Sequence, residues 1–139
     1  MNLDLVLAEW HRGLESLEAA RILTDEGLYA DSISRDYYAV LHLAKSALLV
    51  HGIETESHSS VRRLFGYHLV QSNEIERDWA VCLAECLDNR LAADYDSEII
   101  FSEEEGLLSY RRAKDFQKRI HQYLTSKGIN PALLKKRKK

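Results

Sequence analysis

The scarcity of helix breakers constrains this chain more than any other feature of its sequence. Its 139 residues contain a single proline, Pro131. Apolar residues recur at spacings of three and four, the period of an α-helix, and no useful length alternates between apolar and polar residues as a strand does. The chain is therefore predicted to be all α-helical.

Five helical segments can be placed from this periodicity and from capping residues. We expect helices over residues 3–25, 29–51, 58–71, 75–95 and 102–125. Gly27 and Gly52 end the first two, and Ser102 with Glu105 forms a capping box that begins the last. Because the links are short, neighbouring helices should be antiparallel. The predicted fold is an up-and-down antiparallel bundle of about five helices.

Length and charge limit the class of protein. We expect one helical domain over residues 1–126 and a flexible basic tail over 127–139. The net charge is −3, and the last five residues, KKRKK, carry five positive charges, so the first 134 have a net charge of −8. An acidic body argues against a broad DNA-binding face. Any contact with nucleic acid must be local or made by the tail.

Nothing in the sequence indicates secretion or insertion into a membrane. Asp4 and Glu9 interrupt the first ten residues, and no apolar run approaches the roughly 18 residues that span a bilayer. Cys82 and Cys86, one helical turn apart, lack the further ligands of a metal site and suit free core thiols in a reducing compartment. We therefore expect a cytoplasmic protein with no metal, no cofactor and no membrane contact.

A charge interrupts the apolar face of the fourth predicted helix. That face consists of Ile75, Trp79, Leu83, Cys86 and Leu87. Arg90 continues the stripe and Asp94 lies one turn further along. Charges are rarely buried without a partner. The pair is therefore either an internal salt bridge that fixes helix packing or part of a functional polar site.

A row of polar side chains runs along the second predicted helix, beside its apolar face. Its members are Arg35, Tyr38, His42 and Lys45, which project within an arc of roughly 80°. Cations, an imidazole and a phenol in one row can hold a phosphate and stack a base. His42 could also act as a general acid or base. A merely solvated helix face is the alternative.

Three motifs, in this order, resemble a prokaryotic branch of the HEPN superfamily. They are SRDYYAVLHLA at 34–44, SHSS at 57–60 and RLAADY at 90–95. The resemblance covers roughly residues 3–124. It implies a five-helix, mostly antiparallel bundle that forms homodimers. It also implies a small standalone protein, often encoded beside a minimal nucleotidyltransferase as a toxin–antitoxin pair.

The resemblance is incomplete at one functional position. HEPN domains that cleave RNA carry an arginine followed, after four to six residues, by a histidine, and two such motifs meet across a dimer in a metal-free reaction. Arg90 matches the arginine, but Tyr95 stands where the histidine is expected. Paired toxins also carry a tyrosine two residues later that the partner modifies with AMP, and Ser97 stands there. A phenol, with an ordinary pKa of about 10, is a poor base at neutral pH.

His42 or His58 would have to supply the missing acid–base group. His42, on the polar row, is the stronger candidate, whereas His58 begins a helix and suits a surface position near its cap. We therefore expect Arg90 and His42 as catalytic residues. The expected substrate contacts are Arg35, Tyr38, Lys45, His58, Asp94 and Tyr95.

The sequence leaves two kinds of function open. The first is an RNA- or nucleotide-binding component of a HEPN/minimal-nucleotidyltransferase toxin–antitoxin-type system, acting as a metal-independent endoribonuclease or by binding alone. The second is a non-catalytic helical subunit that presents substrate to a nucleotidyltransferase, or a structural dimeric adaptor. The missing histidine favours the second, and the retained Arg35, His42, Arg90 and Asp94 favour the first.

Overall fold

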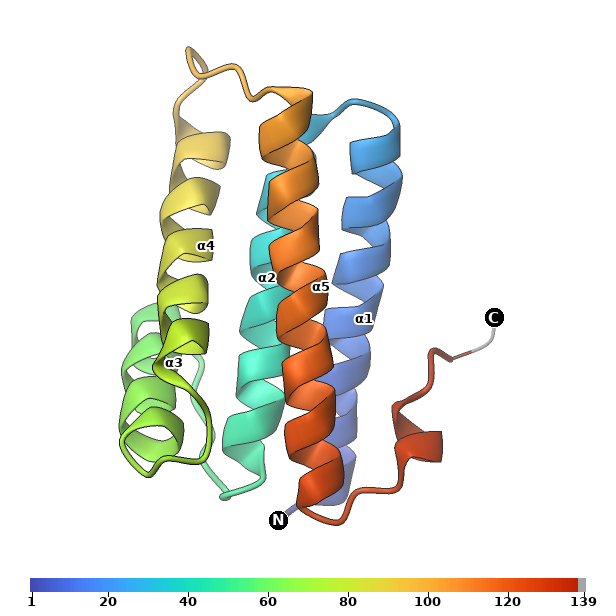
Figure 1. The fold of residues 1–139 in the computed structure, drawn as a ribbon, viewed down its shortest axis with the longest axis vertical. Coiled ribbons are helices and arrows are strands. Elements are labelled where there is room, and N and C mark those ends of the chain that lie inside the picture. Colours follow the sequence, from blue (N-terminus) through green and yellow to red (C-terminus); the bar gives the residue numbers. More distant parts are fainter. Residues whose placement is uncertain (138–139) are drawn as a thin grey trace.

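The computed structural model describes residues 1–137 as a bundle of helices that run alternately up and down (Figure 1). The long helices are α1 (Leu3–Asp25), α2 (Tyr29–Leu49), α4 (Arg77–Tyr95) and α5 (Glu103–Ser126). The short α3 (His58–Phe65) continues into a π-helical turn, η1 (Gly66–Val70), and lies beside α4. The described residues contain no strand, which confirms the predicted all-α bundle. None of their helices is both long and apolar enough to cross a bilayer.

Local sequence signals set the ends of these helices. The predicted capping box is present at the start of α5, where Ser102 accepts from the backbone of Glu105 and the Glu105 side chain accepts from Ser102. Gly27 and Gly52 adopt φ of 76° and 72° after α1 and α2. Glycine adopts this left-handed conformation without steric cost, so both turns form where the sequence predicts them.

Helix α2 lies at the centre of the bundle, packed against α1, α4 and α5. Its predicted apolar face is entirely buried: Ile33, Tyr37, Val40, Leu41, Ala44 and Leu48. Gly13 lets α1 approach it closely, because a Cβ there would lie 2.8 Å from Leu43 Cγ. Gly106 does the same for α5, since its Cβ would lie 2.5 Å from Tyr29 Cδ1. Both α1 and α5 are therefore packed closely against α2.

Residues 129–134 are packed against the bundle, so the expectation of a flexible tail from residue 127 is wrong for this stretch. Ile129 and Leu134 are each only 3% exposed, and η2 (Pro131–Leu134) is a 3-10 helix. The indole Nε1 of Trp10 donates to the Leu134 carbonyl at 2.8 Å. Two apolar side chains and a hydrogen bond to a buried donor outweigh the charge that follows.

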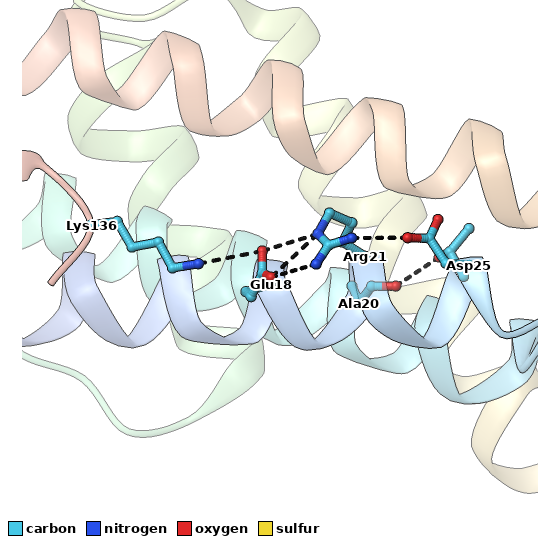
Figure 2. Close-up of polar contacts among 6 residues, drawn as sticks. Glu18, Ala20, Arg21, Asp25 and Lys136 are labelled. Carbon is cyan, nitrogen blue, oxygen red and sulfur yellow. Dashed lines mark hydrogen bonds and ion pairs between the residues drawn. The ribbon is translucent and has the colours of Figure 1, made fainter. Parts of the chain in front are cut away.

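The C-terminal segment also makes a polar contact with α1, shown in Figure 2. Lys136 Nζ lies 3.7 Å from Glu18, which in turn pairs with Arg21 at 2.7 Å. Arg21 also contacts Asp25 at 2.9 Å, one turn further along α1. These contacts are on the surface and stabilise the fold only slightly. The rest of the predicted tail, residues 138–139, lies outside the described residues.

Candidate functional site around Arg90

Arg90 is held among three tyrosine rings between α2 and α4. Its Nη2 donates a hydrogen bond to Tyr38 Oη at 3.0 Å. Its guanidinium carbon lies 5.7, 5.5 and 5.7 Å from the ring centroids of Tyr37, Tyr38 and Tyr95. Only 14% of the side chain is exposed. The charge that interrupts the apolar stripe is therefore largely buried, and the electron-rich ring faces help to stabilise it there.

Asp94 supplies the opposite charge, as its spacing of one helical turn predicts. Its Oδ2 lies 3.0 Å from Arg90 Nε. That Nε is buried and forms no well-aligned hydrogen bond with any described group, so the pair is held by charge. The Asp94 side chain is 28% exposed. A phosphate that binds Arg90 would therefore compete with a single carboxylate, that of Asp94, which is already partly exposed to solvent.

His58, the first residue of α3, contacts the same tyrosines. Its Nδ1 lies 2.6 Å from Tyr37 Oη, and its ring stacks on Tyr37 with centroids 5.5 Å apart. Its ring also meets Tyr38 edge-on at 6.2 Å. The short helix α3 therefore places an imidazole against the tyrosine pair that holds Arg90.

The burial of Tyr37 and the protonation states of Tyr37 and His58 together fix the direction of their hydrogen bond. Burial raises the pKa of Tyr37 to about 12, so the phenol keeps its proton. Burial lowers the pKa of His58, and the charge of Arg90 lowers it further, so the imidazole is neutral at neutral pH. Tyr37 is only 1% exposed and no other described group hydrogen-bonds to its hydroxyl, so its O–H donates to Nδ1 and the ring proton lies on Nε2. That N–H can donate to an anionic oxygen.

The C-terminal half of the polar row is paired with a carboxylate of α1. Glu9 Oε2 lies 2.6 Å from His42 Nδ1, and its Oε1 lies 3.2 Å from Lys45 Nζ. Burial raises the pKa of Glu9, but hydrogen bonds and charge from His42 and Lys45 lower it overall. His42 and Lys45 therefore already contact an acid of the chain itself. Glu9 was not predicted to be a site residue from the sequence, although it immediately precedes the buried Trp10 on α1.

The N-terminal half of the row lines a groove of about 280 Å³ between α1 and α2. Arg35 and Tyr38 line it from α2 and Arg12 lines it from α1, with His42 and Glu15 also on its wall. The Arg35 guanidinium lies 5.4 Å from the Tyr38 ring centroid. Neither arginine has an ion pair within residues 1–137. Their charges are therefore available to a ligand next to Tyr38.

The predicted site residues thus separate into two groups. The first consists of Tyr38, His58, Arg90, Asp94 and Tyr95; together with Tyr37, which was predicted only as a member of the apolar face of the second helix, we call it the Arg90 cluster. Arg35 adjoins this cluster through Tyr38. His42 and Lys45 form the second group with Glu9. The histidine whose ring contacts the cluster's tyrosines is His58, whereas His42, the stronger candidate from the sequence, is hydrogen-bonded to an acid of α1.

A second buried ionisable side chain lies on α2 and was not singled out from the sequence. Asp36 is 1% exposed, and Ser109 of α5 donates to its Oδ2 at 2.6 Å. No described group hydrogen-bonds to its Oδ1. Burial raises the pKa of Asp36 to about 7, and the Ser109 hydrogen bond only partly opposes this. Asp36 interrupts the apolar face of α2 between Ile33 and Val40, just as Arg90 interrupts the apolar face of α4.

No metal site is arranged within residues 1–137, because no three His, Cys, Asp or Glu side chains converge there. Cys86 is buried and Cys82 half-buried, and both are free thiols. The neighbouring Cys82 thiol, together with burial, raises the pKa of Cys86. That thiol is therefore protonated, as the core position predicted from the sequence requires.

Comparisons with known proteins cover most of the chain. The HEPN domain family matches residues 8–125. A UPF0332 protein of Pyrococcus horikoshii is 36% identical over 125 residues, 86% of this chain and 88% of that protein. The protein named "Putative toxin MJ0605" of Methanocaldococcus jannaschii is 34% identical over 110 residues, 79% and 81% of the two chains. A UPF0332 protein of Gloeobacter violaceus is 38% identical over 84 residues, 60% and 67% of the two. With its helical bundle, its Arg90 cluster and these relatives, the chain belongs to the HEPN family.

Proposed function

We propose that this HEPN protein is the RNA-binding component of a toxin–antitoxin-type system and that the Arg90 cluster holds a phosphate of the RNA. One observation carries the proposal: a guanidinium, an imidazole N–H and a phenol come together from α4, α3 and α2. Such donors suit an anionic oxygen. The relative named as a toxin supports the biological setting.

The surroundings of the cluster suit single-stranded RNA. Arg12 and Arg35 supply positive charge in the adjoining groove, which attracts further phosphates. Tyr95 is 74% exposed, so a base could stack on its free face. Proteins that recognise single-stranded RNA commonly stack its bases on aromatic rings. The cluster therefore offers both contacts that an unpaired nucleotide needs.

The geometry supports binding better than cleavage. Metal-free cleavage requires a base that accepts the 2′-hydroxyl proton. Tyr95 is unsuited to that role, and the Nε2 of His58 already carries a proton because Tyr37 donates to Nδ1. An endoribonuclease mechanism through His58 would require the other ring tautomer, in which Nδ1–H donates to Tyr37 Oη and the buried Tyr37 O–H is left without an acceptor. We therefore place RNA cleavage second to RNA binding.

The same missing histidine favours a second candidate function. In that alternative the chain is a non-catalytic subunit that binds a minimal nucleotidyltransferase and presents a substrate to it. A neighbouring gene for such an enzyme, and its co-purification with this chain, would support this candidate. If wild-type protein forms that complex but neither binds nor cleaves RNA, the alternative replaces the first proposal.

We also propose that the functional unit is a homodimer. Two apolar side chains close to Arg90 in the sequence are exposed: Leu91 is 44% and Ile100 91% exposed. Exposed apolar groups that gather at one end of a domain commonly mark a protein interface. Sedimentation equilibrium should give twice the chain mass, and Leu91→Asp with Ile100→Asp should return the mass to that of one chain. A wild-type monomer at all concentrations would refute the dimer.

The proposed RNA site can be tested with a closely matched pair of variants. Arg90→Gln removes the guanidinium of the cluster, and Arg21→Gln removes one that makes the same i,i+4 contact with an aspartate on α1. Charged hydrogen bonds contribute about 1.5–3 kcal/mol, so Arg90→Gln should weaken binding of labelled RNA at least about tenfold. Arg21→Gln should leave binding unchanged.

The same incubation, analysed on a denaturing gel, separates cleavage from binding. Cleavage that Arg90→Gln abolishes would establish a ribonuclease, whereas intact bound RNA supports the binding function. Growth inhibition on expression should be relieved by Arg90→Gln and not by Arg21→Gln. Equal affinity and equal growth inhibition for wild type and Arg90→Gln would overturn the proposal.

A further inference from the structure

A second cationic surface lies between α3–η1 and α4. It is an open groove of about 820 Å³, and Arg62, Arg63 and Arg77 line its walls. All three are exposed, and none has an ion pair within residues 1–137. The described lining contains no acid. On an acidic protein body, three unpaired guanidinium groups create a local positive potential that attracts a polyanion.

An exposed aromatic ring lies in the same groove. Tyr67 is 61% exposed and belongs to the π-helical turn η1. Val70 and Leu87 add apolar surface to the groove, and a Cβ at Gly66 would meet no atom within 4 Å. π-helical turns occur often at functional sites because they change which side chains a helix presents. An open tyrosine among arginines is the combination on which unpaired bases stack.

The groove adjoins the Arg90 cluster. Ser59, which lines it, follows His58 directly in α3. Leu87, which lines it from the other side, lies three residues before Arg90 on α4. Because residues three apart on a helix are neighbours, the groove begins where the cluster ends. A chain of nucleotides bound at one could therefore continue into the other.

We propose that this groove binds single-stranded RNA, with Arg62, Arg63 and Arg77 on its phosphates and Tyr67 stacked on a base. The inference rests on the proposed RNA-binding function and extends it from one phosphate to a run of nucleotides. An acidic protein segment would satisfy the arginines but would give the exposed ring no base to stack on. RNA is therefore the occupant that uses every feature of the groove.

The salt dependence of binding tests the three arginines. The probe is a fluorescently labelled oligouridylate of about 12 nucleotides, a length that single-stranded sites commonly accept. Each neutralised phosphate of a single strand contributes about 0.7 to the slope of log K against log salt, so replacing all three arginines by glutamine should make the slope shallower by about 2. The control replaces Arg111, Lys114 and Lys118 of α5, which also removes three charges, and should leave the slope unchanged.

The aromatic contact has its own test. Tyr67→Ala should weaken oligouridylate binding about tenfold, as loss of one base-stacking contact does, without changing the salt slope. Binding of heparin, a polyanion without bases, should be unaffected. Equal weakening for heparin and RNA, or no weakening of RNA, would show that no base stacks there and would overturn this part of the inference. Circular dichroism of each variant checks that the bundle is intact.

Arg90→Gln, measured in the same series, separates the two proposals. If the triple groove variant keeps the wild-type slope while Arg90→Gln loses affinity, the groove is not part of the site and this inference alone fails. If the slope falls in the groove variant but Arg90→Gln binds normally, the Arg90 site fails and the groove stands. If wild type binds no oligouridylate at about 50 mM salt, both fail.

Discussion

Asp36→Asn is expected to remove a loss of stability that wild-type protein suffers as the pH rises. The Asp36 carboxyl is 1% exposed and has one hydrogen-bond donor, Ser109. Burial raises its pKa from 3.8 to about 7 in the folded protein. Between these values the folded state holds the proton while the unfolded state releases it. Stability contributed by the neutral acid is therefore present below about pH 4 and lost as the pH rises towards and beyond 7.

The size of this effect follows from the difference between the two pKa values. A difference of about three pH units corresponds to roughly 4 kcal/mol of unfolding free energy across the whole range. Between about pH 5 and about pH 8 the change is between about 2 and 3 kcal/mol, because part of the loss has already occurred at pH 5. Asparagine has the shape of the neutral acid, can accept from Ser109 and does not ionise. The variant should therefore not show this pH-dependent loss of unfolding free energy.

Urea unfolding of both proteins at the two pH values provides the assay. Other titrating groups are the same in the two chains, so their contributions cancel in the comparison. Wild type should lose 2 to 3 kcal/mol more than Asp36→Asn between about pH 5 and about pH 8, with the variant the more stable at the higher pH. If wild type and Asp36→Asn lose the same unfolding free energy between the two pH values, the pKa of Asp36 is not raised in the folded protein, and the reasoning is wrong.

Three other contacts give predictions of their own. Gly13→Ala should lower the unfolding free energy by about 1–3 kcal/mol, because its Cβ would lie 2.8 Å from Leu43 Cγ; an unchanged melting temperature would show that α1 and α2 can separate without cost. Tyr37→Phe removes the donor to His58 Nδ1, so the nitrogen NMR shifts of His58 should move away from those of an Nε2–H ring, and unchanged shifts would show that Tyr37 does not set the tautomer. Leu134→Ala should cost about 2–4 kcal/mol in urea unfolding, and a wild-type midpoint would mean that residues 129–134 do not hold to the bundle.

The features that one helix determines by itself were predictable from the sequence. The apolar face of α2 follows from a period of 3.6 residues, and all six of its predicted members are buried. The Arg90–Asp94 contact follows from a spacing of four on one helix. The Ser102 capping box is likewise local, because it needs only residues 102 and 105. Each depends on helix geometry alone.

The features that depend on two helices were not predictable. Glu9 meets His42 because of the rotation of α1 about its axis and its closeness to α2, which no spacing within either helix fixes. His58 meets Tyr37 because of the path of the link between α2 and α3. The docking of residues 129–134 was obscured for another reason: the five cations of residues 135–139 dominate the composition of the C-terminal segment, whereas Ile129 and the 3-10 turn decide the structure before them.

The hydrogen bond between Trp10 and Leu134 has a consequence for how the chain matures on the ribosome. Its partners are 124 residues apart in sequence, so the indole N–H stays without its carbonyl partner until translation has passed residue 134. Helices α1 and α2 can pair earlier, since they are consecutive and pack closely together. Contacts between distant residues form late in folding. Closure of the bundle over Trp10 therefore requires residues 129–134, and a chain that lacks them would leave the indole N–H of Trp10 without this partner.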